Sequence, residues 1–106
     1  MADRKPGALV TGSATGIGRA EAIALARAGY DVMVNFSRSA DEAAETAAAC
    51  AAHGAKTAVV QCDVADDTQV KSMVAEARAA FGRLDVLRNN AGITSSAPFK
   101  DLDAID

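Results

Sequence analysis

The 106-residue sequence predicts an α/β protein built on a doubly wound parallel sheet. Strand-like and helix-like segments alternate three times along the chain and are followed by one more strand. The strand-like segments are short and continuously apolar, which is typical of strands that are buried on both faces of a parallel sheet. The helix-like segments are rich in alanine, whose small side chain lets a helix lie close to a sheet.

Residues 8–36 predict a strand, a helix and a second strand. Residues 8–11 form a short apolar run that ends at a glycine, so we expect a strand there. The alanine-rich stretch 16–28 predicts a helix, and Gly29 follows it in the usual position after a helix end. Residues 31–36, apolar at their centre, predict the second strand.

The second helix is expected over residues 40–53. Ser39 and Glu42 have the spacing of a capping box, in which the serine oxygen accepts from a free helix N–H and the acid reaches back. Gly54 is expected to end this helix. Residues 56–62 then predict the third strand.

The third helix has the clearest amphipathic pattern in the chain. Asp66 and Gln69 form a second cap-like signal at its start, and Gly82 is expected to end it. One helical face is apolar, at Val70, Met73, Val74, Ala77 and Phe81. We interpret these side chains as core rather than as a site.

The end of the sequence predicts a fourth strand, a loop and the approach to another helix. The fourth strand begins with residues 84–87, and residues 89–92 are expected to break it into a loop. Pro98 and the acidic stretch 101–106 are typical of the approach to a further helix.

Composition excludes several classes of protein. Half of the residues are hydrophobic and 24% are charged, which argues against intrinsic disorder. Eleven scattered basic residues face fourteen acidic ones, so a nucleic-acid binder is not expected. The sequence has no apolar run of about 18 residues, so no membrane partner is expected. The first residues lack the apolar stretch of a secretory signal, and we expect a cytoplasmic protein.

The cysteines and the histidine do not suggest a metal site. Cys50 and Cys62 lie twelve residues apart and form no Cys-x-x-Cys pair, and the single His53 cannot complete a zinc site. We interpret the two thiols as small apolar core groups in a reducing compartment. His53 is expected near a helix C-terminus, where the helix dipole favours a cation.

A glycine-rich turn is the first functional signal. Within residues 11–18, Gly12 permits a tight exit from the strand, Gly16 lets a ligand approach the backbone, and Gly18 permits close helix–sheet packing. The free N–H groups at the start of the following helix form an anion site suited to a pyrophosphate. The alternative is a purely structural turn that needs small residues. The position between a strand and a helix favours phosphate binding.

The spacing of this turn resembles that of the short-chain dehydrogenase/reductase family. Thr-Gly-x-x-x-Gly-Ile-Gly at 11–18 is similar to the cofactor turn of the family, and Asn-Asn-Ala-Gly at 89–92 is similar to its second hallmark. Asp63-Val64 matches its adenine-contacting pair. The likeness covers the whole chain, and several apolar positions resemble the ketoacyl-carrier-protein reductases and glucose-dehydrogenase-like members. It implies the N-terminal half of a Rossmann-type sheet, with strand order 3-2-1-4.

The resemblance also implies a set of contacts with a nicotinamide dinucleotide. The pyrophosphate and the adenosine ribose would lie against Gly12, Ser13, Thr15, Gly16, Ile17 and Gly18. Asp63 and the backbone N–H of Val64 would meet the adenine ring. The nicotinamide-side ribose would lie against Asn90, Ala91 and Gly92. Asn89 would instead tie strands together through side-chain-to-backbone hydrogen bonds, and the alternative for Asn89-Asn90 is a plain turn.

The residues after the second strand favour NADP over NAD. An acid there would bind the ribose 2′-hydroxyl and repel a 2′-phosphate, but no acid stands at the end of this strand, and Asp31 precedes the strand core. Arg38 offers a positive fork to a phosphate, and Ser37 offers a hydroxyl. The alternative is a solvated arginine on a loop. Thr15 departs from relatives that use NADP and place a base at that position.

Arg88 is a second departure, because the family usually has an apolar residue there. A charge within a strand buried on both faces is costly unless it is paired. Arg88 therefore either reaches a partner or an open face, or belongs to a strand less buried than in the relatives.

We assign no catalytic residue. In the family a Tyr with a Lys four residues on acts as general acid/base beside a Ser, but the single tyrosine, Tyr30, is followed by Val34 at that spacing. Ser95 and Ser96 come too soon after the Asn-Asn-Ala-Gly stretch to be the catalytic serine. Two hypotheses remain. The chain is either the NAD(P)-binding half-domain of an oxidoreductase that transfers a hydride between a nicotinamide and a carbonyl or alcohol, or a short nucleotide-binding protein without catalysis. We expect residues 1–106 alone to reduce no carbonyl.

Overall fold

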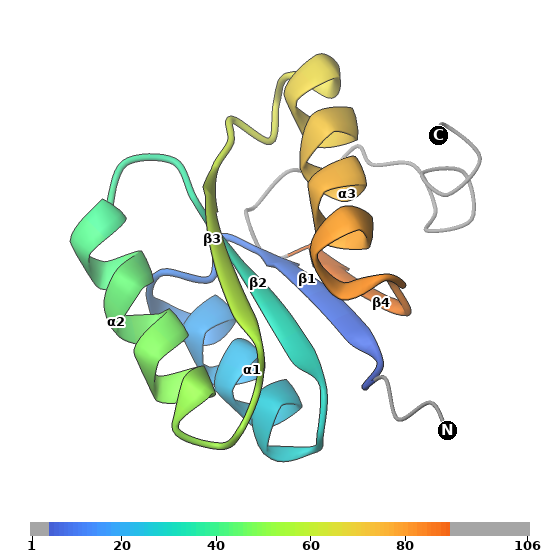
Figure 1. Ribbon diagram of the computed structural model, residues 1–106. Coiled ribbons are helices and arrows are strands. Elements are labelled where there is room, and N and C mark those ends of the chain that lie inside the picture. The colour runs from blue at the N-terminus through green and yellow to red at the C-terminus, as the bar shows by residue number, and fades with distance from the viewer. Residues whose placement is uncertain (1–4, 90–106) are drawn as a thin grey trace.

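The computed structural model describes residues 5–89 of the chain (Figure 1). Strands and helices alternate in the order β1 (Gly7–Thr11), α1 (Gly16–Arg27), β2 (Asp31–Phe36), α2 (Ala40–Ala51), β3 (Thr57–Gln61), α3 (Asp67–Phe81) and β4 (Val86–Asn89). The four strands pair in parallel in the order β3-β2-β1-β4. This confirms the predicted fold class and strand order.

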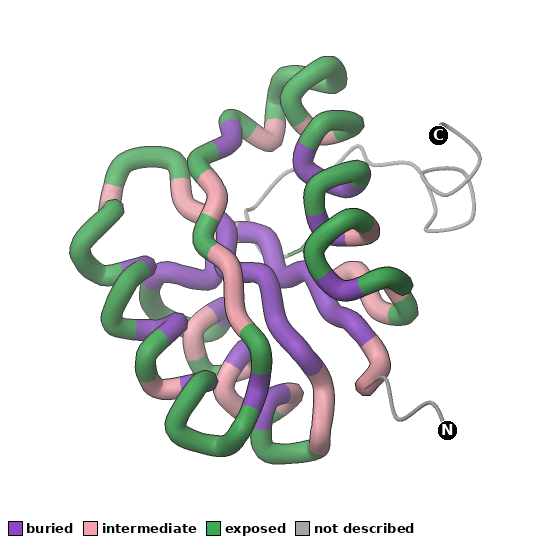
Figure 2. The backbone as a smooth tube through the Cα atoms, viewed as in Figure 1, coloured by how far each residue is buried: buried purple, intermediate pink, exposed green. Residues whose placement is uncertain are grey.

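β1 and β2 form the buried centre of the sheet (Figure 2). In their parallel register Leu9 lies beside Met33 and Val10 beside Val34. Successive side chains of a strand point to opposite faces, so each strand supplies both faces of the sheet. The continuous apolar runs of the two strands are explained by this burial on both faces.

Two hydrophobic clusters pack on the two faces of the sheet. The first joins the Val10 and Val34 face to alanines of α1 and α2, such as Ala22 and Ala47. The second joins the Leu9 and Met33 face to α3, through Met73, Val74, Ala77 and Phe81. Figure 1 shows α1 and α2 together on one side of the sheet and α3 on the other. The predicted apolar face of the third helix is therefore core, with Val70 partly buried at its edge.

The cap predicted for α3 is present, whereas the cap predicted for α2 is not. The Asp66 side chain accepts from the backbone N–H groups of Thr68 and Gln69. Ser39 makes no capping hydrogen bond, so the expected capping box is wrong. Asp66 has extended backbone angles, as a capping residue usually does, but Ser39 has ψ of 67°.

Element ends differ from the prediction by one or two residues. α2 ends at Ala51 rather than at residue 53, and a turn follows in which the Gly54 N–H donates to the Ala51 carbonyl at 2.9 Å. β3 spans 57–61 rather than 56–62. His53 lies exposed in the turn after α2, close to where the sequence predicted a helix end.

The two cysteines are free and buried, as predicted. Cys50 belongs to the cluster under α1 and α2, and Cys62 to the cluster under α3, so the sheet lies between them. Burial raises the pKa of both thiols, which keeps them protonated and unreactive.

β4 has no fully buried residue, and this explains how the charge of Arg88 is accommodated in a strand. The Arg88 guanidinium reaches across to α1, where it pairs with the Glu21 carboxylate at 3.0 Å. The side chain is 54% exposed, so both an ion pair and an open face accommodate the charge. Before the strand, Asp85 accepts from the Gly7 N–H at 2.9 Å and pairs with Arg83, which lowers the pKa of Asp85.

Within residues 5–89, no helix has the length and apolar character needed to cross a membrane. The predictions for residues 90–106 lie outside the described residues. They concern the loop, the further helix and the contacts of Asn90, Ala91 and Gly92.

Candidate dinucleotide-binding site

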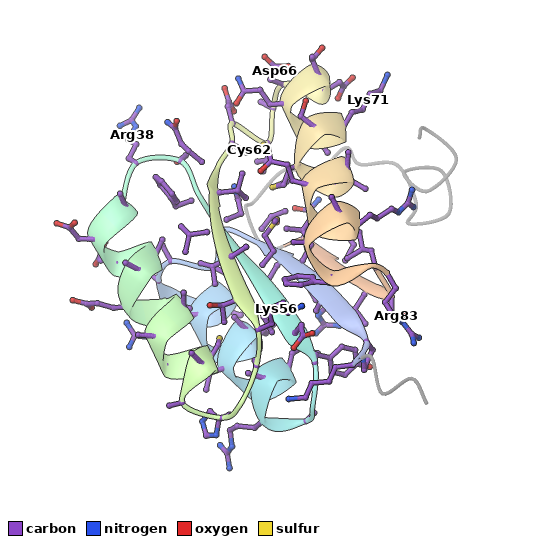
Figure 3. All side chains as sticks on the ribbon, viewed as in Figure 1. Arg38, Lys56, Cys62, Asp66, Lys71 and Arg83 are labelled. Atoms are coloured by element: carbon purple, nitrogen blue, oxygen red, sulfur yellow. The ribbon has the colours of Figure 1, made fainter. Side chains whose placement is uncertain are left out.

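The segments that carry the predicted site residues meet at one edge of the sheet. Parallel strands end on the same side, so the turns after β1, β2 and β3 lie together. In Figure 3, the labelled Arg38 and Asp66 lie at this end, in the segments that follow β2 and β3. Arg83, which precedes β4, lies at the opposite end.

The turn after β1 is open to solvent where α1 begins. Thr15, Gly16 and Ile17 are exposed, and Ile17 is 74% exposed. Gly16 has φ of +62°, and a Cβ built on it would meet no atom within 4 Å. The space beside the Gly16 backbone is therefore open, and the approach of a ligand to it stays a prediction.

Gly18 faces the protein instead of solvent. A Cβ at Gly18 would collide with the carbonyl group of Gly12, whose carbon would lie 2.8 Å away. The first turn of α1 thus packs directly on the turn that precedes it. The sequence predicted close packing of helix on sheet, whereas the close contact of Gly18 is with the Gly12 backbone in the turn after β1.

The start of α1 carries backbone donors without a capping side chain. The first intrahelical bond runs from the Arg19 N–H to the Thr15 carbonyl, so the N–H groups of Gly16, Ile17 and Gly18 precede the helical ladder. Thr15 makes no side-chain cap, and the first turn holds no acidic residue. α3 differs, because the Asp66 carboxylate caps it. An anion at the start of α1 would meet donors that have no partner among residues 5–89, together with the positive end of the helix dipole.

The Ser13 side chain forms hydrogen bonds within the protein. Its side chain is fully buried, and its hydroxyl donates to the Val10 carbonyl at 2.6 Å while accepting from the Asn35 N–H at 3.0 Å. Its own N–H donates to the Asn35 carbonyl at 3.0 Å. Ser13 therefore shapes the turn, and its contact with a cofactor stays a prediction.

Asn35 and Thr46 are residues of this region that sequence reasoning missed. The Asn35 side-chain carbonyl accepts from the Gly12 N–H at 2.9 Å, and the Thr46 hydroxyl donates to the Ala14 carbonyl at 3.0 Å. Both side chains are buried. An asparagine at the end of an apolar strand, and a threonine within an alanine-rich helix, were the signals that could have indicated them.

Ser37 and Arg38 directly follow β2 and are exposed. Because β2 is the neighbour of β1 in the sheet, they lie at the same edge as the glycine-rich turn. Within residues 5–89, the Arg38 guanidinium has no ion pair or side-chain hydrogen bond. Its charge is therefore available to an anion at this edge. The assignment of these two residues to a cofactor phosphate stays a prediction.

Asp63 and Val64 follow β3 at the same edge. One Asp63 carboxylate oxygen accepts from the Ala65 N–H at 3.0 Å, and the Asp63 N–H donates to the Gln69 side chain at 2.9 Å. These bonds fix the segment while leaving Asp63 exposed. Contact of this pair with an adenine ring stays a prediction.

Asn89 ends β4 and is paired with β1. It was expected in a loop, but it lies in the strand, opposite Thr11 in the register. The Thr11 hydroxyl is 3.1 Å from the Asn89 side-chain oxygen and 3.3 Å from the Arg88 carbonyl. The expected tie between strands is present, although it joins two side chains rather than side chain and backbone.

Comparison with known families decides the identity of the fold. The family model described as short chain dehydrogenase matches residues 7–106. The chain belongs to the short-chain dehydrogenase/reductase family. This confirms the resemblance seen in the three sequence motifs.

Curated relatives include both long and short members of the family. The chain is 47% identical over 87 residues to the 3-oxoacyl-[acyl-carrier-protein] reductase FabG of Staphylococcus aureus, which covers 82% of this chain and 35% of the reductase. It is 42% identical over 97 residues to the short-chain dehydrogenase/reductase homolog YusS of Bacillus subtilis, covering 92% of this chain and 89% of YusS. The chain thus spans about a third of the FabG length.

Solved structures of the family share the fold. A short chain dehydrogenase from Burkholderia cenocepacia, solved in complex with NADP, matches with a TM-score of 0.79 and 40% identity, over 93% of this chain and 41% of that one. A putative short-chain dehydrogenase/reductase from Burkholderia xenovorans matches with a TM-score of 0.80 and 33% identity, over the whole chain and 43% of that structure.

Among residues 5–89, the groups at this edge are backbone donors, small residues, the exposed Asp63 carboxylate and the Arg38 guanidinium. Tyr30 precedes β2, at the other end of the strand from Ser37 and Arg38, and packs against the cluster under α1 and α2. Tyr30 is therefore not placed to serve this edge of the sheet.

Proposed function

We propose that residues 1–106 form an NAD(P)-binding half-domain that holds a nicotinamide dinucleotide across the carboxyl edge of the sheet. The observation that carries the proposal is the uncapped, exposed start of α1, with open space at Gly16. A pyrophosphate is the part of the cofactor that fits unpaired backbone donors at a helix start. When bound, the nicotinamide supplies the hydride chemistry for which the family is named, and this chain's residues bind and orient it.

The contact set proposed for the cofactor extends along the same edge. The turn after β1 faces the pyrophosphate through Thr15, Gly16 and Ile17, with Gly12, Ser13 and Gly18 shaping it. Asp63 and Val64 face the adenine, and Asn90, Ala91 and Gly92 belong to the nicotinamide side.

We propose NADP(H) as the preferred cofactor because of the charge after β2. Arg38 is exposed and is unpaired within the described part of the chain, and β2 ends at Phe36 rather than at an acid that would repel a 2′-phosphate. Ser37 adds an exposed hydroxyl. The similar Burkholderia cenocepacia structure was solved with NADP, which supports this preference.

The cofactor preference is tested by the substitution Arg38→Ala. Loss of a hydrogen bond to a charged group costs about 1.5–3 kcal/mol, so NADPH binding should weaken by about tenfold or more, with little change for NADH. Dissociation constants from nicotinamide fluorescence measure both. Arg27→Ala, which removes an exposed arginine from the last turn of α1, is the matched control. Equal losses for the two cofactors would contradict the assignment of Arg38.

A second function, nucleotide binding without catalysis, is favoured by one observation. YusS is matched over 89% of its length, so a relative of similar length is known. The first function is that of the cofactor portion of a reductase or dehydrogenase acting on a carbonyl or CH–OH group, as the FabG similarity supports. Both functions predict that residues 1–106 bind NADPH without oxidising it in the presence of ketones, and measurable ketone reduction by this chain would contradict that expectation. An in-frame coding sequence after residue 106 that supplies a Ser and a Tyr-x-x-x-Lys pair would favour the first function, and a stop codon there would favour the second.

We place this function in the cytoplasm. The buried, unpaired thiols of Cys50 and Cys62 support a reducing compartment.

A further inference from the structure

Three consecutive residues of the glycine-rich turn are held by buried groups of two other elements. The Gly12 N–H donates to the Asn35 side-chain carbonyl at 2.9 Å, and the Ser13 N–H donates to the Asn35 backbone carbonyl at 3.0 Å. The Ala14 carbonyl accepts from the Thr46 hydroxyl at 3.0 Å. The turn after β1 is therefore attached to the end of β2 and to the middle of α2.

Asn35 has its hydrogen-bonding capacity committed to this attachment. Its side-chain amide lies within 3.3–3.4 Å of the carbonyls of Phe36, Val60 and Cys62, so the amide nitrogen is held by β3 while the oxygen faces Gly12. The residue is 2% exposed and Thr46 is fully buried. Hydrogen bonds at both the nitrogen and the oxygen orient the amide, and burial keeps water from competing for either atom.

The attachment decides which backbone groups of the turn remain for a ligand. The N–H groups of Gly12 and Ser13 and the Ala14 carbonyl point into the protein, whereas the segment from Thr15 to Ile17 is exposed. Free backbone donors bind an anion well only if they are held in place before it arrives. A side chain that fixes residues 12–14 therefore raises the affinity of the neighbouring residues 15–18 for an anion, without contacting that anion itself.

We propose that Asn35 and Thr46 are positioning residues for the cofactor phosphates. They hold the turn through Gly12 and Ala14 so that the start of α1 presents its donors in one arrangement. The expected effect on cofactor binding rests on the proposed function. The fixing of the turn rests on the hydrogen bonds alone.

The test compares two substitutions of Thr46. Thr46→Val keeps the shape of the side chain and removes the hydroxyl that bonds Ala14, whereas Thr46→Ser keeps the hydroxyl. We expect Thr46→Val to weaken NADPH binding about tenfold and Thr46→Ser to restore most of it. Val74→Ala, in the cluster on the opposite face of the sheet, is a control for general loss of stability.

Melting temperatures of all variants are measured beside the dissociation constants. If Val74→Ala lowers the melting temperature as much as Thr46→Val does and weakens NADPH binding equally, the positioning role is overturned. The role is supported if only Thr46→Val weakens binding at matched stability.

A second measurement needs no cofactor. Hydrogen exchange of the Gly12 amide should accelerate at least tenfold in Asn35→Ala, while the Leu9 and Val34 amides of the central strands keep their protection. Unchanged exchange at Gly12 would overturn the inference. If the unmodified chain binds no NADPH, the proposed function fails, and the exchange data alone still decide whether Asn35 fixes the turn. Should Asn35→Ala not fold, the exchange of the hydrogen-bonded Ser13 amide in Thr46→Val, compared with Thr46→Ser, decides in its place.

Discussion

Gly18 sets how closely α1 approaches the turn that follows β1. A Cβ there would collide with the Gly12 carbonyl, and backbone would have to move to make room. Forcing a methyl group into a packed site typically costs about 1–3 kcal/mol, so Gly18→Ala should lower the free energy of unfolding by that amount. Urea denaturation measures it. Ala20→Ser, at an exposed position of the same helix, should change stability by less than about 0.5 kcal/mol. Equal stability of the Gly18→Ala variant and the native chain would show that this contact is wrongly described.

At the residue scale, the sequence predicted the roles that depend on a local pattern of residues. It missed the roles that depend on partners far away in the chain. The positions of Gly16 and Gly18 in the turn were predicted because both lie at a characteristic spacing between a strand and a helix. Asn35 and Thr46 were missed because their roles need partners 23 and 32 residues away, at Gly12 and Ala14. Arg88 could not be decided from sequence, since the Glu21 that pairs with it lies 67 residues earlier.

At the scale of elements, the starts of α2 and α3 form a natural comparison. The Asp66 carboxylate caps α3, whereas the Ser39 hydroxyl makes no capping bond to α2. Asp66→Ala should therefore destabilise the protein by about 1 kcal/mol, the usual cost of losing a cap, and Ser39→Ala by close to nothing. Denaturant unfolding of the two variants measures the difference. Equal losses would mean that Ser39 caps α2 in solution.

This pair also shows why a cap signal in sequence is incomplete. Ser39 and Asp66 both precede a helix, and both have an acid or amide three residues later. The backbone at Ser39 has ψ of 67°, which no residue pattern revealed, while Asp66 is extended. Periodicity was a stronger signal, because the apolar face of α3 has only one way to be buried against the sheet.

At the scale of the whole molecule, the fold gathers the candidate site at one edge of a parallel sheet. The order β3-β2-β1-β4 places the turns after β1, β2 and β3 together. Alternation of strands and helices predicted a parallel sheet with right-handed crossovers, and the resemblance to the short-chain dehydrogenase/reductase family implied its strand order. The contacts that pack the turns against one another were not predictable, because they depend on distances between elements.

The central claim is that the start of α1 and its neighbouring turns bind a nicotinamide dinucleotide. Titration of the ¹⁵N-labelled chain with NADPH, followed by amide chemical shifts, tests it most directly. The claim predicts saturable shifts at Thr15, Gly16, Ile17 and Gly18, and at Arg38 and Val64, with the amides at the opposite edge of the sheet, such as Arg83, unmoved. An absence of shifts, or shifts confined to that opposite edge, would contradict it.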